Sequence, residues 1–193
     1  MRKLIMKMSV TIDGFVAGLD GKKDWIFKSS DETSRAWLVE RNWEAGLIIM
    51  GRKSFQDMAP YWPTATGPFA GPMNEIPKAV FTQKGFKVGL PNTVQSPAAA
   101  SWAEAQVLDG DLAEEIKKLK SQPGKPIWAL GGAGFVRNLI KTGLVDEYLL
   151  ITHPVILGTG LAIFQDIQQP LALKLADTQS FPGGIVANTY QTV

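Results

Sequence analysis

Short runs rich in apolar residues recur along the chain and predict strands. The first run alternates apolar and polar residues, whereas the later runs are continuous, as in strands that are covered on both faces. The predicted strands are 3–12 with a brief continuation at 15–17, 47–50, 78–82, 127–130 and 148–157. Two further runs, 171–180 and 185–192, flank Pro182-Gly183-Gly184 and predict a terminal antiparallel hairpin.

Between these strands, apolar residues recur at helical spacing and predict helices. Four helices are predicted. The first begins after Ser30 or Asp31 and ends at Gly46, and the second opens at 51–54 and runs through Met58. The third begins at Asp109 or Asp111, and the fourth follows 131–134 and ends at Gly143. Residues 59–77 contain five prolines and two glycines and predict an irregular loop. Residues 85–105 show only weak strand patterns, around Val88 and Val94.

The alternation of strands and helices predicts one α/β domain over residues 1–193. Its sheet is expected to be mostly parallel, with the C-terminal hairpin as antiparallel strands at one edge. A length of 193 residues suits a single core, and 45% hydrophobic and 20% charged residues are ordinary for a globular protein.

Composition narrows the classes of partner. A net charge of +2 gives no reason to expect nucleic acid or an anionic membrane, and no apolar run is long enough to cross a bilayer. The N-terminal apolar stretch is interrupted by Lys7, which argues against a signal peptide. The absence of cysteine excludes a thiolate metal site, and a single histidine cannot form a histidine cluster. We therefore expect a cytoplasmic protein without a metal.

Two predicted strands run through glycine into a helix. Gly51 is followed by Arg52, Lys53 and Ser54, and the second turn is Gly131-Gly132-Ala133-Gly134. Backbone N–H groups at such turns can bind phosphate, and the two cations suit a phosphate monoester. The alternatives are that the glycines only allow tight turns and that Arg52 and Lys53 are solvated surface charges.

Several motifs together resemble the dihydrofolate reductase superfamily. They are Asp13-Gly14-x-x-Ala17, Ile49 to Ser54, Gly131-Gly132-x-Gly134, Gly143-Leu144-Val145-Asp146-Glu147 and Pro154-Val155-x-Leu157-Gly158-x-Gly160. The chain is most similar to the reductase domain of the bifunctional riboflavin-biosynthesis deaminase–reductase and to its stand-alone bacterial relatives. This resemblance implies a three-layer α/β/α fold, a homodimer that could use an edge strand at 155–161, and NADPH as cofactor.

The resemblance also implies roles for individual residues. The expected cofactor contacts are Ala17, Gly51, Arg52, Lys53, Ser54, Thr82, Gly131, Gly132, Ala133, Gly134 and Phe135, with Lys84 as a further candidate. The expected substrate contacts are Val16, Trp25, Trp62 and Pro154, and Tyr61 is a further candidate for the rim of the pocket. No cluster of basic residues for a substrate phosphate is visible in the sequence.

Reduction of a C=N bond requires a proton as well as a hydride, so a proton donor is expected near the substrate. The resemblance implies as candidates Asp13 in the first turn and Asp31 or Glu32 after Trp25. The alternatives are an ordinary Asp-Gly turn for Asp13 and an N-cap and first-turn acid for the other two. His153 lies in an apolar run, which favours a core histidine over a catalytic one.

The function predicted from the resemblance is an NADPH-dependent reductase of a small nitrogen heterocycle, similar to 5-amino-6-(5-phosphoribosylamino)uracil reductase. The alternatives are a dihydrofolate (pterin) reductase and a nucleotide-binding protein without turnover. A weaker alternative is a scaffold protein whose glycine turns are only structural; it would bind no nucleotide.

Overall fold

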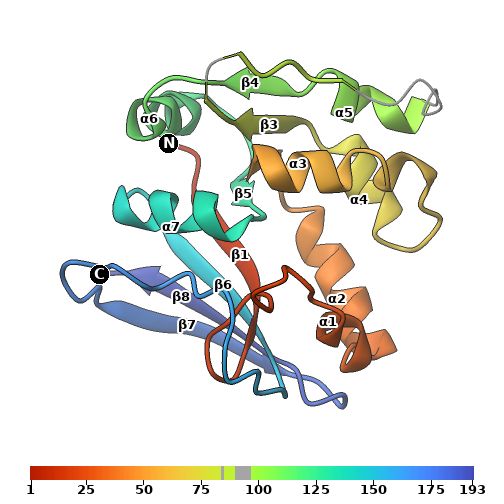
Figure 1. The fold of residues 1–193 in the computed structure, drawn as a ribbon, viewed down its shortest axis with the longest axis vertical. Coiled ribbons are helices and arrows are strands. Elements are labelled where there is room, and N and C mark those ends of the chain that lie inside the picture. Colours follow the sequence, from red (N-terminus) through yellow and green to blue (C-terminus); the bar gives the residue numbers. More distant parts are fainter. Residues whose placement is uncertain (84, 90–96) are drawn as a thin grey trace.

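A computed structural model describes residues 1–83, 85–89 and 97–193 of the chain. Eight strands form one sheet in the order β4-β3-β2-β5-β1-β6-β8-β7 (Figure 1). The strands are β1 (Leu4–Thr11), β2 (Leu47–Gly51), β3 (Lys78–Phe81), β4 (Gln106–Leu108), β5 (Ile127–Ala129), β6 (Glu147–His153), β7 (Leu173–Ser180) and β8 (Val186–Thr192). In this order, each strand from β4 across the sheet to β6 pairs in parallel with its neighbour. Strands β8 and β7 then add two antiparallel strands at one edge. This confirms the predicted α/β class.

Helices cover both faces of the sheet. They are α1 (Trp25–Lys28), α2 (Glu32–Asn42), α3 (Arg52–Met58), α4 (Ala70–Glu75), α5 (Ala100–Ala103), α6 (Leu112–Ser121) and α7 (Ala133–Lys141), with short 3-10 turns at Trp62–Thr64 and Pro97–Ala99. None of the described helices is long and apolar enough to cross a membrane.

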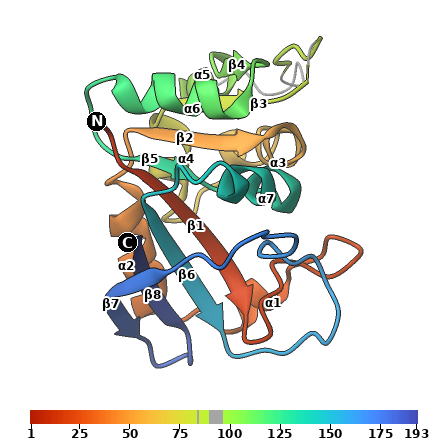
Figure 2. The ribbon, with the colours of Figure 1, turned by 90° about the vertical axis from the view of Figure 1, so that its left-hand side faces the viewer.

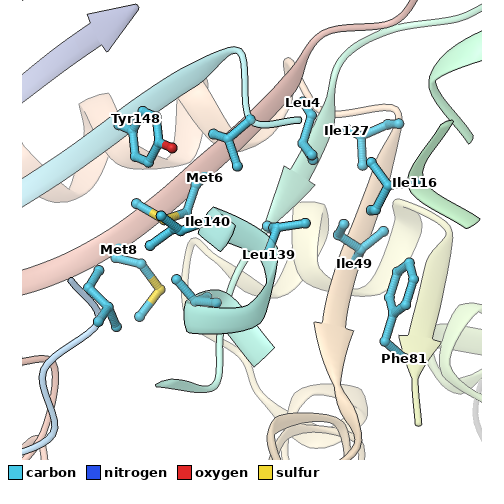
Figure 3. Close-up of a cluster of buried hydrophobic side chains, with 14 of the residues drawn as sticks. Leu4, Met6, Met8, Ile49, Phe81, Ile116, Ile127, Leu139, Ile140 and Tyr148 are labelled. Carbon is cyan, nitrogen blue, oxygen red and sulfur yellow. The ribbon is translucent and has the colours of Figure 1, made fainter. Parts of the chain in front are cut away.

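A hydrophobic cluster lies on each face of the sheet, between the strands and the helices. There are two clusters because successive residues of a strand point to opposite faces. On one face, Met6 and Ile49 of the sheet pack with Leu139 of α7 (Figure 3). On the other face, Ile5 packs with Leu38 of α2 and the cluster continues to α3, α4 and α5. Strand β1 lies between β5 and β6 in the middle of the molecule (Figure 2). The sheet is therefore covered on both sides where the parallel strands lie.

Helix boundaries follow their capping residues. Asp31 caps α2 by accepting from the Ser34 amide, and Asp111 caps α6 by accepting from the Glu114 amide. Helix α2 ends at Asn42 and not at the predicted Gly46. Trp43, just past this end, is 39% exposed, although its place in an apolar helical pattern predicts a core position.

The structure corrects three further predictions of secondary structure and adds two elements. The proline-rich segment 59–77 contains helix α4. The helix tolerates Pro72 because this residue lies in its first turn, where no N–H donor is required. Helix α5 and strand β4 were not predicted. Strand β6 ends at His153 because Pro154 has no N–H to extend the ladder. Residues 15–17 contribute only a bridge from Phe15 to Ala162. The predictions at Val94 and Lys84 lie outside the described residues.

Candidate active site

A cavity of about 900 Å³ opens where the parallel strands end. Its walls include Ser9 of β1, Gly51 of β2, Phe81 of β3, Leu130 after β5 and His153 of β6. Ligands of open α/β sheets bind outside the carboxyl ends of the strands, where successive loops leave a crevice. The position of this cavity is therefore the one expected of a cofactor and substrate site.

The two glycine turns meet at this cavity. Because β2 and β5 are neighbours, the Gly51 amide donates to the Gly131 carbonyl at 3.0 Å. A Cβ on Gly51 would lie 2.8 Å from the Cβ of Phe135, so glycine at this position lets α7 approach β2. Gly131 has a φ of +107°, a conformation that glycine adopts without steric cost, and the Gly131–Gly132 peptide bond is cis.

Helix α7 begins at this junction without a side-chain cap. Gly132 is its N-cap residue and provides no side-chain acceptor for the first amides of the helix. A Cβ on Gly134 would meet no atom within 4 Å, so the space beside the first turn is open. Free amides and open space together fit a phosphate group.

All eleven residues predicted to contact the cofactor line the cavity. They are Ala17, Gly51, Arg52, Lys53, Ser54, Thr82, Gly131, Gly132, Ala133, Gly134 and Phe135. Thr82 Oγ1 is buried and has no hydrogen-bond partner in the described structure, as expected of a group whose partner is a ligand. The placement of these residues fits a dinucleotide, and their individual roles stay predictions.

The cavity is rich in positive charge. Its lining includes five cationic side chains and one carboxylate: Lys7, Lys23, Arg35, Arg52, Lys53 and Asp57. The Asp57 carboxylate lies 3.7 Å from Lys53 in an exposed ion pair, which contributes little to stability. Arg52 lies 5.8 Å from the centre of the Phe86 ring. Cations far apart in sequence are thus brought together, although the sequence showed no basic cluster.

Only two of the four predicted substrate residues reach the cavity. Val16 and Trp62 line it, whereas Trp25 and Pro154 do not. Trp25 lies in α1, is 9% exposed, and meets the His153 ring edge-on with the two centres 5.1 Å apart. Tyr61, the further candidate for the rim, is exposed and does not line the cavity.

None of the three predicted proton donors lines the cavity. The Asp13 carboxylate accepts from the amides of Leu157 and Gly158, and the hydroxyl of Thr11 is the main cause that lowers its pKa. The carboxylate therefore stays ionised and ties the first turn to the segment after β6. This arrangement argues against Asp13 as a proton donor.

Asp31 has a structural role as well. Its carboxylate accepts from the Thr33 hydroxyl at 2.6 Å, the Ser34 amide at 2.7 Å and the Gly183 amide at 2.6 Å. These bonds, with that of Thr33 first, lower its pKa well below the ordinary range. Glu32 is exposed in the first turn of α2. The N-cap alternative considered from the sequence is thus the one that the structure supports.

Sequence reasoning missed Lys7 and Ser9 of β1, and it predicted His153 as a core histidine, which agrees with its 1% exposure although it also lines the cavity. All three line the cavity, and Lys7 and Ser9 are the two partly exposed positions of an otherwise buried strand. No described acidic residue pairs with Lys7, and burial lowers its pKa to about 8. A charged residue in the middle of an apolar strand was the pattern that could have identified it.

A family model described as the RibD C-terminal domain matches residues 2–187. The chain belongs to this family. It is 34% identical over 190 residues to the uncharacterized protein YyaP of Bacillus subtilis (strain 168), an alignment that covers 98% of this chain and 94% of YyaP. The family assignment confirms the resemblance that the sequence motifs indicated.

Solved structures support the same fold for this RibD C-terminal-domain protein. A putative riboflavin biosynthesis protein from Shewanella sp. PV-4 matches with a TM-score of 0.74 at 21% identity, covering 100% of this chain and 99% of that one. A deaminase/5-amino-6-(5-phosphoribosylamino)uracil reductase from Thermotoga maritima matches with a TM-score of 0.69 at 15% identity, covering 100% of this chain and 57% of that one. At these identities the likeness concerns the fold.

Proposed function

We propose that this RibD C-terminal-domain protein is an NADPH-dependent reductase of a small nitrogen heterocycle. The observation that carries the proposal is the meeting of the two glycine turns, joined from Gly51 to Gly131, at a cavity lined by all eleven predicted cofactor residues. The named activity of the Thermotoga maritima relative, reduction of an aminouracil, supports a substrate of this class.

The residues around the cavity suit NADPH. The free amides at the start of α7 would hold the pyrophosphate, Arg52 and Lys53 the 2′-phosphate, and the unpartnered Thr82 hydroxyl a ribose oxygen. The bound nicotinamide would supply the hydride. The remaining task of the chain is to orient the substrate and provide a proton.

Lys7 is the side chain best placed to provide that proton. Lys7 lines the cavity, and its lowered pKa of about 8 lets it release a proton near neutral pH. A general acid works best when its pKa lies near the working pH. Lys7 thus replaces the three carboxylates that the sequence suggested.

A homodimer in the cytoplasm completes the proposal. The segment 155–161 is not part of a strand, but β7 is an edge strand whose residues are largely exposed, including Leu175. An exposed edge strand is a surface on which a second chain can pair. The absence of cysteine from the chain is compatible with a reducing compartment.

The test is a titration of the purified protein with NADPH and with NADH, followed by quenching of tryptophan fluorescence. We expect tighter binding of NADPH, because only NADPH carries the 2′-phosphate. Arg52→Ala should remove this preference, whereas Lys118→Ala, which removes an exposed charge on α6 outside the cavity, should not. Failure to bind either nucleotide would refute the proposal.

Turnover is tested separately from binding. The protein with saturating NADPH is offered aminouracils, with and without a ribosyl group, and dihydrofolate as the alternative substrate. Oxidation of NADPH that depends on an aminouracil supports the proposal. Tight NADPH binding without turnover of either class would instead support a nucleotide-binding protein that is not a reductase.

A further inference from the structure

A second cavity, of about 880 Å³, lies at the other ends of the parallel strands. Leu47, Lys78 and Gln106 line it, and they are the first residues of the neighbouring strands β2, β3 and β4. Most of the remaining lining comes from α4, α5 and the segments beside them. The two cavities share no lining residue. A ligand in the second cavity would therefore be separate from the proposed cofactor and substrate.

Lys78 is a buried cation in the wall of the second cavity. It is 2% exposed, and its Nζ donates to the Ile76 carbonyl at 2.5 Å and to Ser101 Oγ at 2.7 Å. Ser101 also lines the cavity, and its hydroxyl is attached directly to Cβ, so this hydrogen bond holds Nζ at the cavity wall. Lysine is almost never buried to this extent unless it is paired.

No described acid compensates the charge of Lys78. Both partners of Nζ are neutral oxygens, and burial lowers the pKa of Lys78 to about 7 without an opposing effect from a nearby carboxylate. The ring of Trp102 lies 4.7 Å from Nζ and offsets part of this cost. An ammonium group has three hydrogens, and two of them are used. A carboxylate of a ligand would supply both an acceptor and the counter-charge.

The neighbouring polar groups are already paired and hold this wall in place. Ser101 donates to the Asn74 carbonyl, and the Asn74 side chain accepts from Trp102 Nε1 and donates to the Trp62 carbonyl, both at 2.9 Å. Within this described cluster, the ammonium is the group that retains a free donor. The contact offered to a ligand is therefore fixed in position before binding, which lowers the cost of binding.

The rest of the lining indicates the body of the ligand. Most lining residues are small and apolar, such as Pro63, Ala70 and Pro77. Glu75 and Glu104 also line the cavity, and both are exposed, so they would repel a second negative charge on a ligand. These features favour one carboxylate on an apolar body over a phosphate or a nucleotide.

We propose that the second cavity binds a small organic monocarboxylate with an apolar body, whose carboxylate accepts the remaining hydrogen of the Lys78 ammonium. This site lies outside the cofactor cavity and does not rest on the proposed function. The alternative is that Lys78 serves only to satisfy the carbonyl of Ile76, the C-cap residue of α4.

The first test is calorimetry of the purified protein with 3-phenylpropanoate as the probe. We expect binding in the millimolar range or tighter, as a ligand of this size allows. The neutral analogue 3-phenylpropanamide should bind at least about 10-fold more weakly, because it cannot form the charged hydrogen bond. Benzylmalonate, which adds a second carboxylate to the same body, should also bind more weakly. Equal affinity for the amide, or no binding of 3-phenylpropanoate at millimolar concentration, would overturn the proposal.

The second test locates the bound probe. Lys78→Met should weaken binding at least about 10-fold, whereas Lys118→Met, an exposed position on α6 outside both cavities, should leave it unchanged. Since Lys78→Met also removes two hydrogen bonds, a further variant keeps the lysine. Ala70→Phe adds a ring at a half-buried position of the lining and should weaken binding as well. Unchanged affinity in either folded variant would overturn the proposal, because the probe would then bind elsewhere.

The outcomes separate this inference from the proposed function. Quenching of tryptophan fluorescence by NADPH is measured on the same samples, and we expect it to persist in Lys78→Met and Ala70→Phe. Loss of quenching in the unmodified protein with 3-phenylpropanoate binding intact would refute the cofactor site alone. Quenching without 3-phenylpropanoate binding would refute the second site alone.

Discussion

At the scale of single residues, Lys7 is the side chain whose position requires a functional explanation. It interrupts the apolar core of β1, and no described acid pairs with it. A partly buried ammonium without a counter-charge destabilises the folded state. Such a residue is retained where its charge or its proton is used, which agrees with the proposed role as acid.

Replacement of Lys7 should separate stability from activity. Lys7→Met is expected to keep or raise the free energy of unfolding and to lower kcat about 10²-fold or more. In the unmodified protein, kcat should fall as the pH rises through about 8, because only the protonated amine can act as the acid. Lys7→Arg should lose this alkaline decline, and a decline that persists in this variant would contradict the role. The measurements are pH–rate profiles and urea unfolding.

His153 should make the fold sensitive to acid. Its pKa is about 4 in the folded protein and 6.5 ordinarily, so between these values the unfolded chain binds a proton that the folded chain does not. Stability is therefore complete above pH 6.5 and decreases as the pH falls toward 4, by up to about 3 kcal/mol. Urea unfolding at pH 7.5 and pH 5 measures the decrease, which His153→Gln should largely abolish. An equal decrease in that variant would assign the effect to other groups.

Some predictions for single residues could be made from the local sequence, whereas others required the tertiary structure. The two glycine turns could be identified from the sequence, because each follows a buried strand and opens a helix, which is a local pattern. The places of Lys7 and His153 at the cavity could not, since they depend on which strands are neighbours and on helix α1. Asp31 was a candidate from its distance to Trp25, yet its carboxylate is already satisfied by three hydrogen bonds.

At the scale of elements, the site depends on the close approach of β2 and α7. Gly51→Ala would place a Cβ 2.8 Å from the Cβ of Phe135, which cannot rotate away. We expect a loss of about 1–3 kcal/mol in the free energy of unfolding and weaker binding of NADPH. The control is Gly67→Ala, where a Cβ meets no atom within 4 Å. Equal stability of the two variants in thermal unfolding would contradict the packing argument.

A second connection between elements joins the start of α2 to the turn between β7 and β8. Asp31→Ala removes the cap of α2 and the acceptor for Gly183, so the free energy of unfolding should fall by about 1–2 kcal/mol. Affinity for NADPH and kcat of the folded fraction should stay near the values of the unmodified protein. Glu32→Ala, one residue later, should change neither. Loss of turnover in Asp31→Ala with stability intact would restore the catalytic interpretation.

The elements that the sequence predicted correctly are those with a capping residue, such as α2 and α6, and the buried parallel strands with their continuous apolar runs. The missed elements are short and depend on tertiary contacts. Strand β4 has three residues and is defined by its pairing with β3, and α5 is held by the buried ring of Trp102. Patterns this short do not distinguish a strand or helix from a loop.

At the scale of the whole molecule, the proposed dimer can be tested at two surfaces. Leu175→Lys places a charge on the edge strand β7, where Leu175 is 51% exposed, and Ile156→Lys does so in the segment first predicted from the sequence. We expect light scattering to show a dimer at micromolar concentration that only Leu175→Lys converts to a monomer. A dimer disrupted only by Ile156→Lys would favour the segment 155–161. A monomeric unmodified protein would refute the dimer.

The central position of β1 has a consequence for synthesis of the chain. Its partners are far along the sequence, with Leu4 beside Ile127 and Ile5 beside Glu147. At ribosomal rates of about 5–20 residues per second, this first strand waits on the order of ten seconds or more before β6 has been made. Such distant pairing slows folding, and the apolar strand stays open to wrong partners meanwhile. Lys7, the proposed acid of the finished site, also places a charge in this strand, where charges oppose aggregation of the nascent chain.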